Sequence, residues 1–268
     1  MTPTKDMGRV LIVAGSDSGG GAGIQADIKT VTALGGYAAT AVTALTAQNT
    51  LGVHDVVGLE PDFITRQMTV VLDDIGADCI KTGMLHNSAV IETVAATCAL
   101  WPKIRLVVDP VMFAKGGHAL LEESAVYALT TRLLPLAHVV TPNIPEAEAL
   151  ACMTIKSVED MHDACRKIAA FGCQAVLLKG GHLDGDQLTD VLYENDVFEL
   201  FEGERIDSRH THGTGCTLAS ALATGLAQRR SLSQAVSRGR DYVRQAILTA
   251  PGFGSGHGPL NHGHTMSG

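Results

Sequence analysis

Short runs of hydrophobic residues alternate along this chain with longer stretches in which hydrophobic residues recur every three or four positions. The short runs are rich in Val, Ile and Leu, and each ends in polar or glycine residues, a pattern typical of buried parallel strands. The longer stretches predict amphipathic helices. We therefore predict an α/β fold, a three-layer α/β/α sandwich with a mostly parallel central sheet.

The pattern places the elements at definite positions. We expect strands over residues 9–14, 38–45, 78–83, 105–110, 138–143 and 175–180. We expect helices over residues 22–34, 61–73, 88–99, 122–133, 145–151, 157–170, 214–228 and 231–249. The segments DVLYEN and VFELFE (190–202) predict a hairpin that turns at Asn195-Asp196. The segment GFGSGHGPLNHGHTMSG (252–268) is too rich in glycine for regular structure, and we expect it to be partly mobile.

Length and composition predict a single domain over residues 1–268, with a core of about 9–250 and a glycine- and histidine-rich tail over 251–268. A chain of 268 residues with 46% hydrophobic content can bury a sizeable core. A net charge of −8 argues against nucleic acid as the main partner. No hydrophobic run approaches the roughly 18 residues of a membrane span, and VLIVA (10–14) is too short for the core of a signal peptide. We expect a cytoplasmic protein that binds neither nucleic acid nor membranes.

The segment HTHGTGCTLASALATGL (210–226) carries the most specific chemistry. Gly213 and Gly215 permit a tight turn, so the N–H groups of the following helix start, including Thr214, would form a hole for an anion. A helix N-terminus also lowers the pKa of a thiol, which makes Cys216 a candidate nucleophile or proton acceptor. The alternative is that Cys216 is a small residue filling the first turn. The other five cysteines are most simply hydrophobic core residues.

The segment GSDSGGGAGIQAD (15–27) predicts a glycine-rich turn between a strand and a helix, where the backbone can approach a ligand closely. Residues 21–26 fit the pattern G-x-G-x-x-A, which suggests dinucleotide binding. That interpretation lacks the acidic residue at the end of the second strand, where TALTAQN stands instead. A purely structural turn is a serious alternative.

Polar residues follow three further strands. Asp109 could hold a metal-bound water, although a simple Asp-Pro turn is about as plausible. Asn143 and Glu146 have the spacing of a helix-capping box, but a carboxylate at a strand end also suits Mg²⁺. Lys179, in KGGH (179–182), could meet nucleotide phosphates or could simply be solvated. Because the carboxyl ends of parallel strands share one edge of the sheet, we expect these residues to converge.

In their order and spacing these segments resemble the ribokinase-like superfamily, and within its vitamin kinase branch the hydroxymethylpyrimidine/phosphomethylpyrimidine kinases of thiamin biosynthesis. The resemblance runs from about Val10 to His262. It rests on AGSDSGGGAGIQADIKT, TALTAQNT, KTGML, DPVM, TPNIPEAE, LLKGGH, THGTGCTLASALA and GHGPLNH. It implies ATP as phosphoryl donor, Mg²⁺ as cofactor, and phosphorylation of 4-amino-5-hydroxymethyl-2-methylpyrimidine to its monophosphate and then its diphosphate.

The resemblance also implies roles for individual residues. The pyrimidine would be surrounded by Gly15, Asp27, Gln48, Met84 and Val111. Asp109 and Glu146 would hold Mg²⁺, Asn143 and Lys179 would bind ATP, and residues 213–216 would receive the transferred phosphoryl group. Ser18 stands where the family commonly has proline. No Walker A sequence occurs, as expected if the helix start binds the phosphate instead.

Three alternatives are carried forward. Pyridoxal kinase is the second candidate within the kinases, because related enzymes accept both ring types. A dinucleotide-dependent oxidoreductase would bind NAD at residues 19–26. A regulator that binds a pyrimidine without turnover is the third. The family resemblance also suggests a homodimer.

Overall fold

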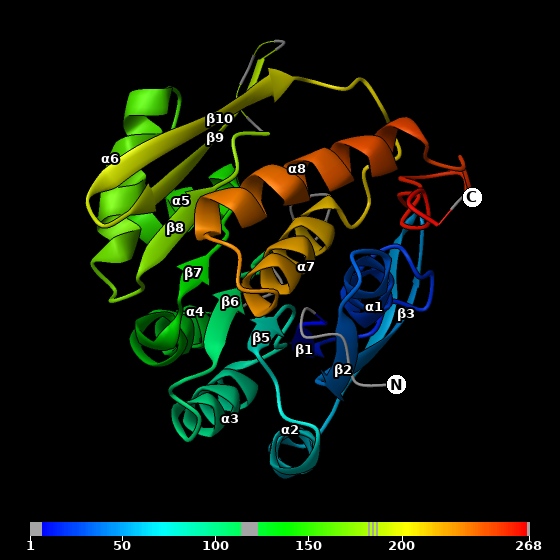
Figure 1. Cartoon of the computed structure of the whole chain (residues 1–268), viewed down its shortest axis with the longest axis vertical. Helices are drawn as coiled ribbons and strands as arrows, with labels where there is room; N and C mark the ends of the chain where they lie inside the picture. Colours follow the sequence, from blue (N-terminus) through cyan, green and yellow to red (C-terminus); the bar gives the residue numbers. More distant parts are fainter. Residues whose placement is uncertain (1–6, 114–122, 182, 184, 186, 267–268) are drawn as a thin grey trace.

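A computed structural model describes residues 7–113, 123–181, 183, 185 and 187–266. Within these residues the central sheet has eight strands in the order β10-β9-β8-β7-β6-β5-β1-β2. The six strands from β2 to β8 in that order run parallel, and β9 and β10 add an antiparallel hairpin at one edge. The predicted mostly parallel sheet is therefore confirmed (Figure 1).

The strands agree closely with the runs predicted from the sequence, although most end earlier. They are β1 (Arg9–Ala14), β2 (Tyr37–Val42), β5 (Cys79–Thr82), β6 (Arg105–Val108), β7 (Val139–Val140), β8 (Ala175–Leu178), β9 (Gln187–Glu194) and β10 (Val197–Glu204). The predicted hairpin turns at Asn195 and Asp196, which both have positive φ, as a tight two-residue turn requires.

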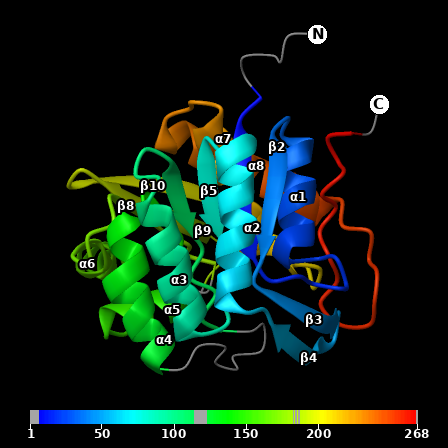
Figure 2. The same cartoon turned by 90° about the horizontal axis from the view of Figure 1, so that it is seen from below.

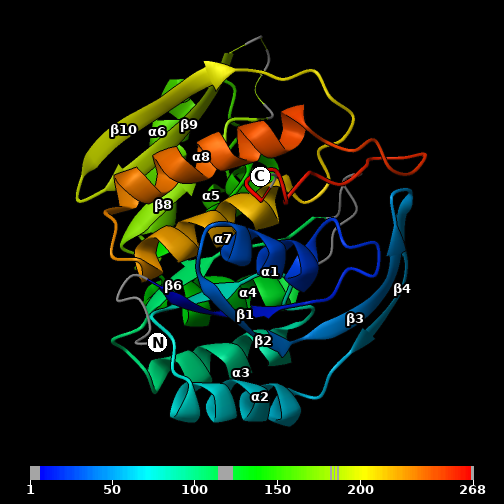
Figure 3. The same cartoon turned by 45° about the vertical axis from the view of Figure 1, so that its right-hand side comes forward.

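Helices cover both faces of the sheet, which gives three layers (Figures 1 and 3). One face carries α1 (Gly23–Ala33), α7 (Thr214–Ala227) and α8 (Leu232–Leu248). The other carries α2 (Pro61–Asp74), α3 (Ser88–Ala99), α4 (Glu123–Ala128), α5 (Ile144–Ala151) and α6 (Val158–Ala169). Alternate residues of β1 show the two-sided burial: Leu11 and Val13 pack into one core, whereas Val10 and Ile12 pack into the other.

The expected strand over 38–45 is wrong at its end, because the chain leaves the sheet at Thr43. The Thr43 hydroxyl donates to the carbonyl of Met84 at 2.7 Å, and the next residue begins a separate two-stranded sheet. This sheet consists of β3 (Ala44–Asn49) and β4 (Gly52–Gly58), with an irregularity in register between Ala47 and Gln48. In Figure 2 it projects beyond the carboxyl edge of the main sheet. It brings Gln48 to the turn after β1, where the Gln48 N–H donates to the Ser18 hydroxyl at 2.8 Å.

The expected helix over 122–133 also changes form. Residue 122 lies outside the described residues, and α4 ends at Ala128. A π turn (Leu129–Leu133) and a 3₁₀ turn (Leu134–Leu136) follow. Thr130 and Thr131 donate their hydroxyls to carbonyls one turn back, an arrangement that bends helices, and Pro135 cannot continue an α-helix.

The tail is irregular, as predicted, but residues 257–262 are packed rather than loose. Leu260 and His262 are buried, and the Tyr242 hydroxyl donates to the His262 carbonyl at 2.6 Å. His262 Nε2 lies 2.9 Å from the Thr217 hydroxyl of α7. Polar contacts with helices α7 and α8 and with the β3–β4 turn therefore replace the internal hydrogen bonds that this segment lacks. No helix in the described part of the chain combines the length and hydrophobicity needed to cross a membrane.

Candidate active site

The polar residues predicted at strand ends meet at the carboxyl edge of the sheet. Asp109 directly follows β6, and Lys179 directly follows β8. Lys179 Nζ lies 3.3 Å from Asp109 Oδ1, and both side chains are largely buried. Gly215 lies against the same pair, since a Cβ built on it would be 3.3 Å from Lys179 Nζ. The expected convergence of Asp109, Lys179 and Gly215 is therefore confirmed.

The glycine-rich turn and the start of α7 pack against each other. Gly213 precedes the helix with φ +83°, a conformation that favours glycine. A Cβ on Gly213 would overlap the carbonyl oxygen of Gly21. Because α7 begins at Thr214, the N–H groups of Gly215 and Cys216 belong to its first turn, where helical hydrogen bonding leaves donors available. These donors lie beside Lys179, at the place where the sequence predicts an anion hole.

Cys216 is not an activated thiol. Burial raises its pKa to about 11, and the nearby carboxylates of Asp27 and Asp109 act in the same direction. The ammonium of Lys81 and a hydrogen bond from the Gly23 N–H oppose this shift without overcoming it. The expectation that the helix N-terminus lowers this pKa is wrong, because burial of the thiol raises it. Cys216 is neutral at pH 7.

Asn143 and Glu146 form the predicted capping box of α5. The Asn143 side chain accepts from the Glu146 N–H at 3.0 Å, and Glu146 Oε2 accepts from the Asn143 N–H at 2.9 Å. Glu146 Oε1 also accepts from the Met112 N–H at 3.1 Å. Burial raises the pKa of Glu146, and the charge of Lys179 opposes that shift. Glu146 thus fixes both the start of α5 and the loop after β6.

These carboxylates are compatible with Mg²⁺. No group of three or more His, Cys, Asp or Glu side chains suited to a metal occurs among the described residues. Mg²⁺, however, is usually bound through one or two carboxylates, with water and phosphate completing its shell. Burial lowers the pKa of Lys179, whereas the charges of Asp109 and Glu146 both raise it. Both carboxylates therefore lie close to the same ammonium group. The residues present fit a water-rich magnesium site.

Asp27 is fully buried rather than exposed on a wall of the site. Both of its carboxylate oxygens lie 2.9 Å from Lys81 Nζ, and Oδ1 also accepts from the Ser220 hydroxyl at 2.6 Å. Burial raises the pKa of Asp27, but these donors favour its ionised form, and the carboxylate raises the pKa of Lys81. The pair therefore lies charged beneath Cys216. The predicted contact of Asp27 with a pyrimidine has to compete with this ion pair.

The other residues assigned to the ring lie on neighbouring segments. Gly15 donates its N–H to the Met84 carbonyl at 3.2 Å, and a Cβ on Gly15 would lie 2.5 Å from the Met84 methyl group. Gln48, on β3, reaches His212, with 3.3 Å between their Nε2 atoms. Val111 has φ +45°, which is strained for a β-branched residue and typical of positions held for function. His182 of the KGGH segment lies outside the described residues.

Sequence reasoning missed Asp17 and His212. The buried Asp17 carboxylate accepts from the N–H groups of Gly19, Gly21 and Ala22. These donors would have to bind the pyrophosphate of a dinucleotide, so their engagement by Asp17 argues against NAD at residues 19–26. The signal was an aspartate opening a glycine-rich turn, where its side chain commonly binds the following N–H groups.

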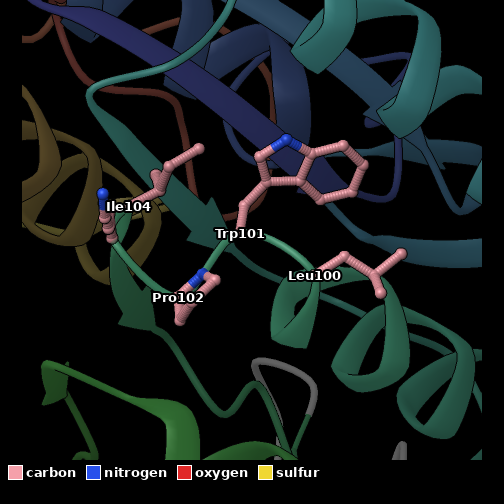
Figure 4. Close-up of a pocket in the computed structure, with 5 residues that line it drawn as sticks. Leu100, Trp101, Pro102 and Ile104 are labelled. Atoms are coloured by element: carbon pink, nitrogen blue, oxygen red, sulfur yellow. The ribbon is translucent and has the colours of Figure 1, made fainter.

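A hollow elsewhere on the surface is unrelated to this site (Figure 4). It is lined by Leu100, Trp101, Pro102, Lys103 and Ile104. These residues precede β6 and therefore lie at the amino edge of the sheet, opposite Asp109.

Comparison with known proteins identifies relatives across the whole fold. The family model described as phosphomethylpyrimidine kinase matches residues 17–261. A thiamine biosynthesis bifunctional protein of Geobacter sulfurreducens is 51% identical over 95% of this chain, which spans 52% of that protein. The hydroxymethylpyrimidine/phosphomethylpyrimidine kinase of Bacillus subtilis is 46% identical over 95% of this chain and 94% of its own length.

Two solved structures are similar over nearly the whole chain. Pyridoxal kinase of Staphylococcus aureus, in complex with AMP-PCP and pyridoxal, superposes with a TM-score of 0.88 at 36% identity, over 96% of this chain and 94% of that one. Phosphomethylpyrimidine kinase of Clostridium difficile superposes with a TM-score of 0.81 at 40% identity, over 89% of this chain and 99% of that one.

Proposed function

Because this chain belongs to the phosphomethylpyrimidine kinase family, we propose that it phosphorylates 4-amino-5-hydroxymethyl-2-methylpyrimidine with ATP, and then phosphorylates the monophosphate to the diphosphate, for thiamin biosynthesis. The observation that carries this proposal is the junction of Lys179, Asp109 and Gly215 at the start of α7. It combines a fixed positive charge with backbone donors at one point, as transfer of a phosphoryl group requires.

The N–H groups of the α7 start and the Lys179 ammonium bind the transferred phosphoryl group. Lys179 stays charged in its buried setting because Asp109 and Glu146 raise its pKa. Asn143, at the end of the neighbouring strand, contacts ATP. The solved pyridoxal kinases that bind ADP or AMP-PCP support a nucleotide in this fold. Asp109 and Glu146 would hold Mg²⁺, which neutralises charge on the phosphates when bound.

Cys216 contributes as a neutral thiol in this proposal. Transition states of phosphoryl transfer are usually loose, so the alcohol of the first substrate needs little early proton removal. The nucleophile of the second step is a phosphate monoester that carries close to two negative charges at pH 7, and it needs no base. A thiol with a pKa of about 11 accepts either nucleophile without charge repulsion.

Gln48 reads the pyrimidine edge in this proposal. Its amide both donates and accepts, which matches a ring nitrogen beside an exocyclic amino group. Gly15, Met84 and Val111 provide the surrounding walls, and Asp27 supports them through Lys81 from the interior. We further propose that the protein is cytoplasmic and that it forms a homodimer. Light scattering of the purified protein would test the homodimer.

Pyridoxal kinase is the second candidate, because the pyridoxal kinase structures superpose with TM-scores of 0.88 to 0.89. The deciding experiment measures ADP release with the pyrimidine alcohol, its monophosphate and pyridoxal in parallel, with and without Mg²⁺. We expect ADP release with both pyrimidines and strict dependence on Mg²⁺. Turnover of pyridoxal alone would favour the second candidate. Pyrimidine binding without ADP release would favour a regulator.

A further inference from the structure

His212 joins three parts of the site. Its backbone directly precedes Gly213, and its N–H donates to the carbonyl of Gly258 in the tail at 3.2 Å. Its ring lies against Gly21, where a Cβ would come within 2.5 Å of the ring carbon Cδ2. Its Nε2 faces both Asp17 and Gln48. The glycine at position 21 and the packed tail together hold this imidazole in one place.

The Asp17 carboxylate determines where the proton of His212 lies. His212 Nε2 is 2.9 Å from Asp17 Oδ2, and the exposed fraction of Asp17 is only 2%. Burial opposes ionisation of Asp17, but hydrogen bonds from His212 and from the Ala22 and Gly19 N–H groups lower its pKa. An ionised carboxylate only accepts hydrogen bonds, so His212 Nε2 carries a proton and cannot itself accept one.

The same reasoning fixes the amide of Gln48. A half-turn of the amide exchanges its oxygen and nitrogen, so its neighbours decide which atom faces His212. With Gln48 Nε2 at 3.3 Å from His212 Nε2, two donors face each other. On the other side, Gln48 Oε1 lies 3.3 Å from the Thr46 hydroxyl, whose single proton goes to the Ser16 carbonyl at 2.8 Å. The half-turn places the amide nitrogen where it donates to the Thr46 hydroxyl oxygen, and it places the amide oxygen where it shares the single His212 Nε2 proton with Asp17 Oδ2.

We propose that His212 is a specificity-determining positioning residue: with Thr46 it holds the amide of Gln48 with its oxygen toward His212 and its nitrogen toward Thr46. Each amide atom then keeps one bonding position for a ligand, a second lone pair on the oxygen and a second proton on the nitrogen. This inference rests on the proposed function, in which Gln48 reads the pyrimidine. The amino group of the substrate binds on the His212 side and the ring nitrogen on the Thr46 side.

The held amide should discriminate against a ring with the inverse pattern. The 4-oxo analogue of the pyrimidine alcohol presents an oxygen acceptor and a protonated ring nitrogen. With the Gln48 amide held in place, its oxygen would face the oxo oxygen and its NH₂ group would face the ring N–H, so neither pair could form a hydrogen bond. We expect the wild-type protein to prefer the 4-amino ring in kcat/KM by about a hundredfold or more, because mismatched buried polar groups are rejected strongly.

The decisive variants remove the two neighbours separately. His212→Leu and Thr46→Val each free the amide to turn, so the amino-to-oxo ratio of kcat/KM should fall at least about tenfold in both. His212→Gln keeps an N–H donor near the position of Nε2 and should restore the ratio to within about threefold of wild type. Gln48→Ala should abolish the preference. A ratio unchanged in both His212→Leu and Thr46→Val would overturn the proposal, as would a wild-type ratio near one.

A second measurement is independent of turnover. In the ligand-free wild-type protein labelled with ¹⁵N, the side-chain NH₂ of Gln48 should show nuclear Overhauser contacts to protons of Thr46 and not to the His212 ring. Contacts to the His212 ring instead would overturn the orientation. Failure of both pyrimidines as substrates, with the Thr46 contacts present, would overturn the proposed function while leaving the held amide standing.

Discussion

The backbones of Gly213 and Gly21 pack so closely that no side-chain carbon fits between them. This contact joins the turn after β1 to the start of α7, although nearly two hundred residues separate the two segments. It sets the direction in which the first N–H groups of α7 point. The geometry of the proposed anion hole is therefore a product of tertiary packing as much as of the helix itself.

Gly213→Ala should abolish most activity, because the added methyl group would push the start of α7 away from Gly21. Gly35→Ala is a matched control: Gly35 also has positive φ, +77°, but a Cβ there meets only Gln228 at 3.9 Å. The control should lose about 1 to 2 kcal/mol of stability from backbone strain alone and keep its activity. Thermal unfolding and kcat/KM measured on both variants separate strain from contact. Equal activity in the two variants would contradict the assignment.

Glu146→Ala should cost more than loss of a helix cap. It removes the acceptor for the buried N–H of Met112 and the partly buried N–H of Asn143, and a buried group left unpaired costs about 1 to 3 kcal/mol. Asp160→Ala is the control, since Asp160 completes a similar capping box with Ser157 at the exposed start of α6. Only the Glu146 variant should also lose activity, with partial rescue by excess Mg²⁺. Unchanged kcat at a lowered melting temperature would show that Glu146 serves the fold alone.

The reactivity of Cys216 should rise steeply with pH. Because its pKa is about 11, its rate of alkylation by iodoacetamide should increase roughly tenfold per pH unit from pH 8 to 10. The exposed Cys152 provides an internal reference, and peptide mass spectrometry follows both sites. Burial gives this thiol a higher pKa in the folded state than its ordinary value of 9.0, so its contribution to stability is present below pH 9 and is lost between pH 9 and about 11. A plateau in alkylation rate near pH 7 would contradict a neutral thiol.

Cys216→Asp should separate the two proposed phosphorylation steps. A carboxylate a few ångströms from the monophosphate dianion would repel it by about 1 to 4 kcal/mol, depending on the local dielectric. The alcohol is uncharged and escapes this penalty. Assayed separately, the second step should lose far more kcat/KM than the first. Equal losses would show that charge compatibility does not explain the cysteine.

Removing one partner of the buried Lys81–Asp27 pair should lower the free energy of unfolding more than removing the charge of both. Lys81→Met leaves Asp27 as an unpaired buried charge, and we expect a loss of about 3 to 5 kcal/mol in unfolding free energy. Adding Asp27→Asn should recover a large part of that loss, because the uncharged amide introduced there can still accept from the Ser220 hydroxyl. Denaturant unfolding of the two single variants and the double variant measures the coupling. Strictly additive losses would contradict the ion pair.

The main sheet could be predicted from sequence because each buried parallel strand is a hydrophobic run bounded by polar residues, as in β1 and β8. The departure at Thr43 could not, because residues 38–45 read as one mostly apolar stretch, whereas the contacts of Thr43 and Ala44 at the end of the strand, with Met84 and Ser16, are tertiary. In the candidate site, too, some residues could be predicted from the sequence and others could not. Asp109 and Lys179 follow from their places at strand ends. Asp27 was assigned by resemblance, and its burial depends on Lys81 and Ser220, which lie far from it in sequence.

The packed tail has a consequence for the growing polypeptide. Thr217 lies in the first turn of α7, and its partner His262 is 45 residues further along the chain. Burial lowers the pKa of His262 to about 4, so this imidazole is inserted uncharged. While a ribosome is still making those residues, α7 can form but lacks its support on that side. The support of this helix on the side of Thr217 therefore comes from residues that are synthesised after the helix itself.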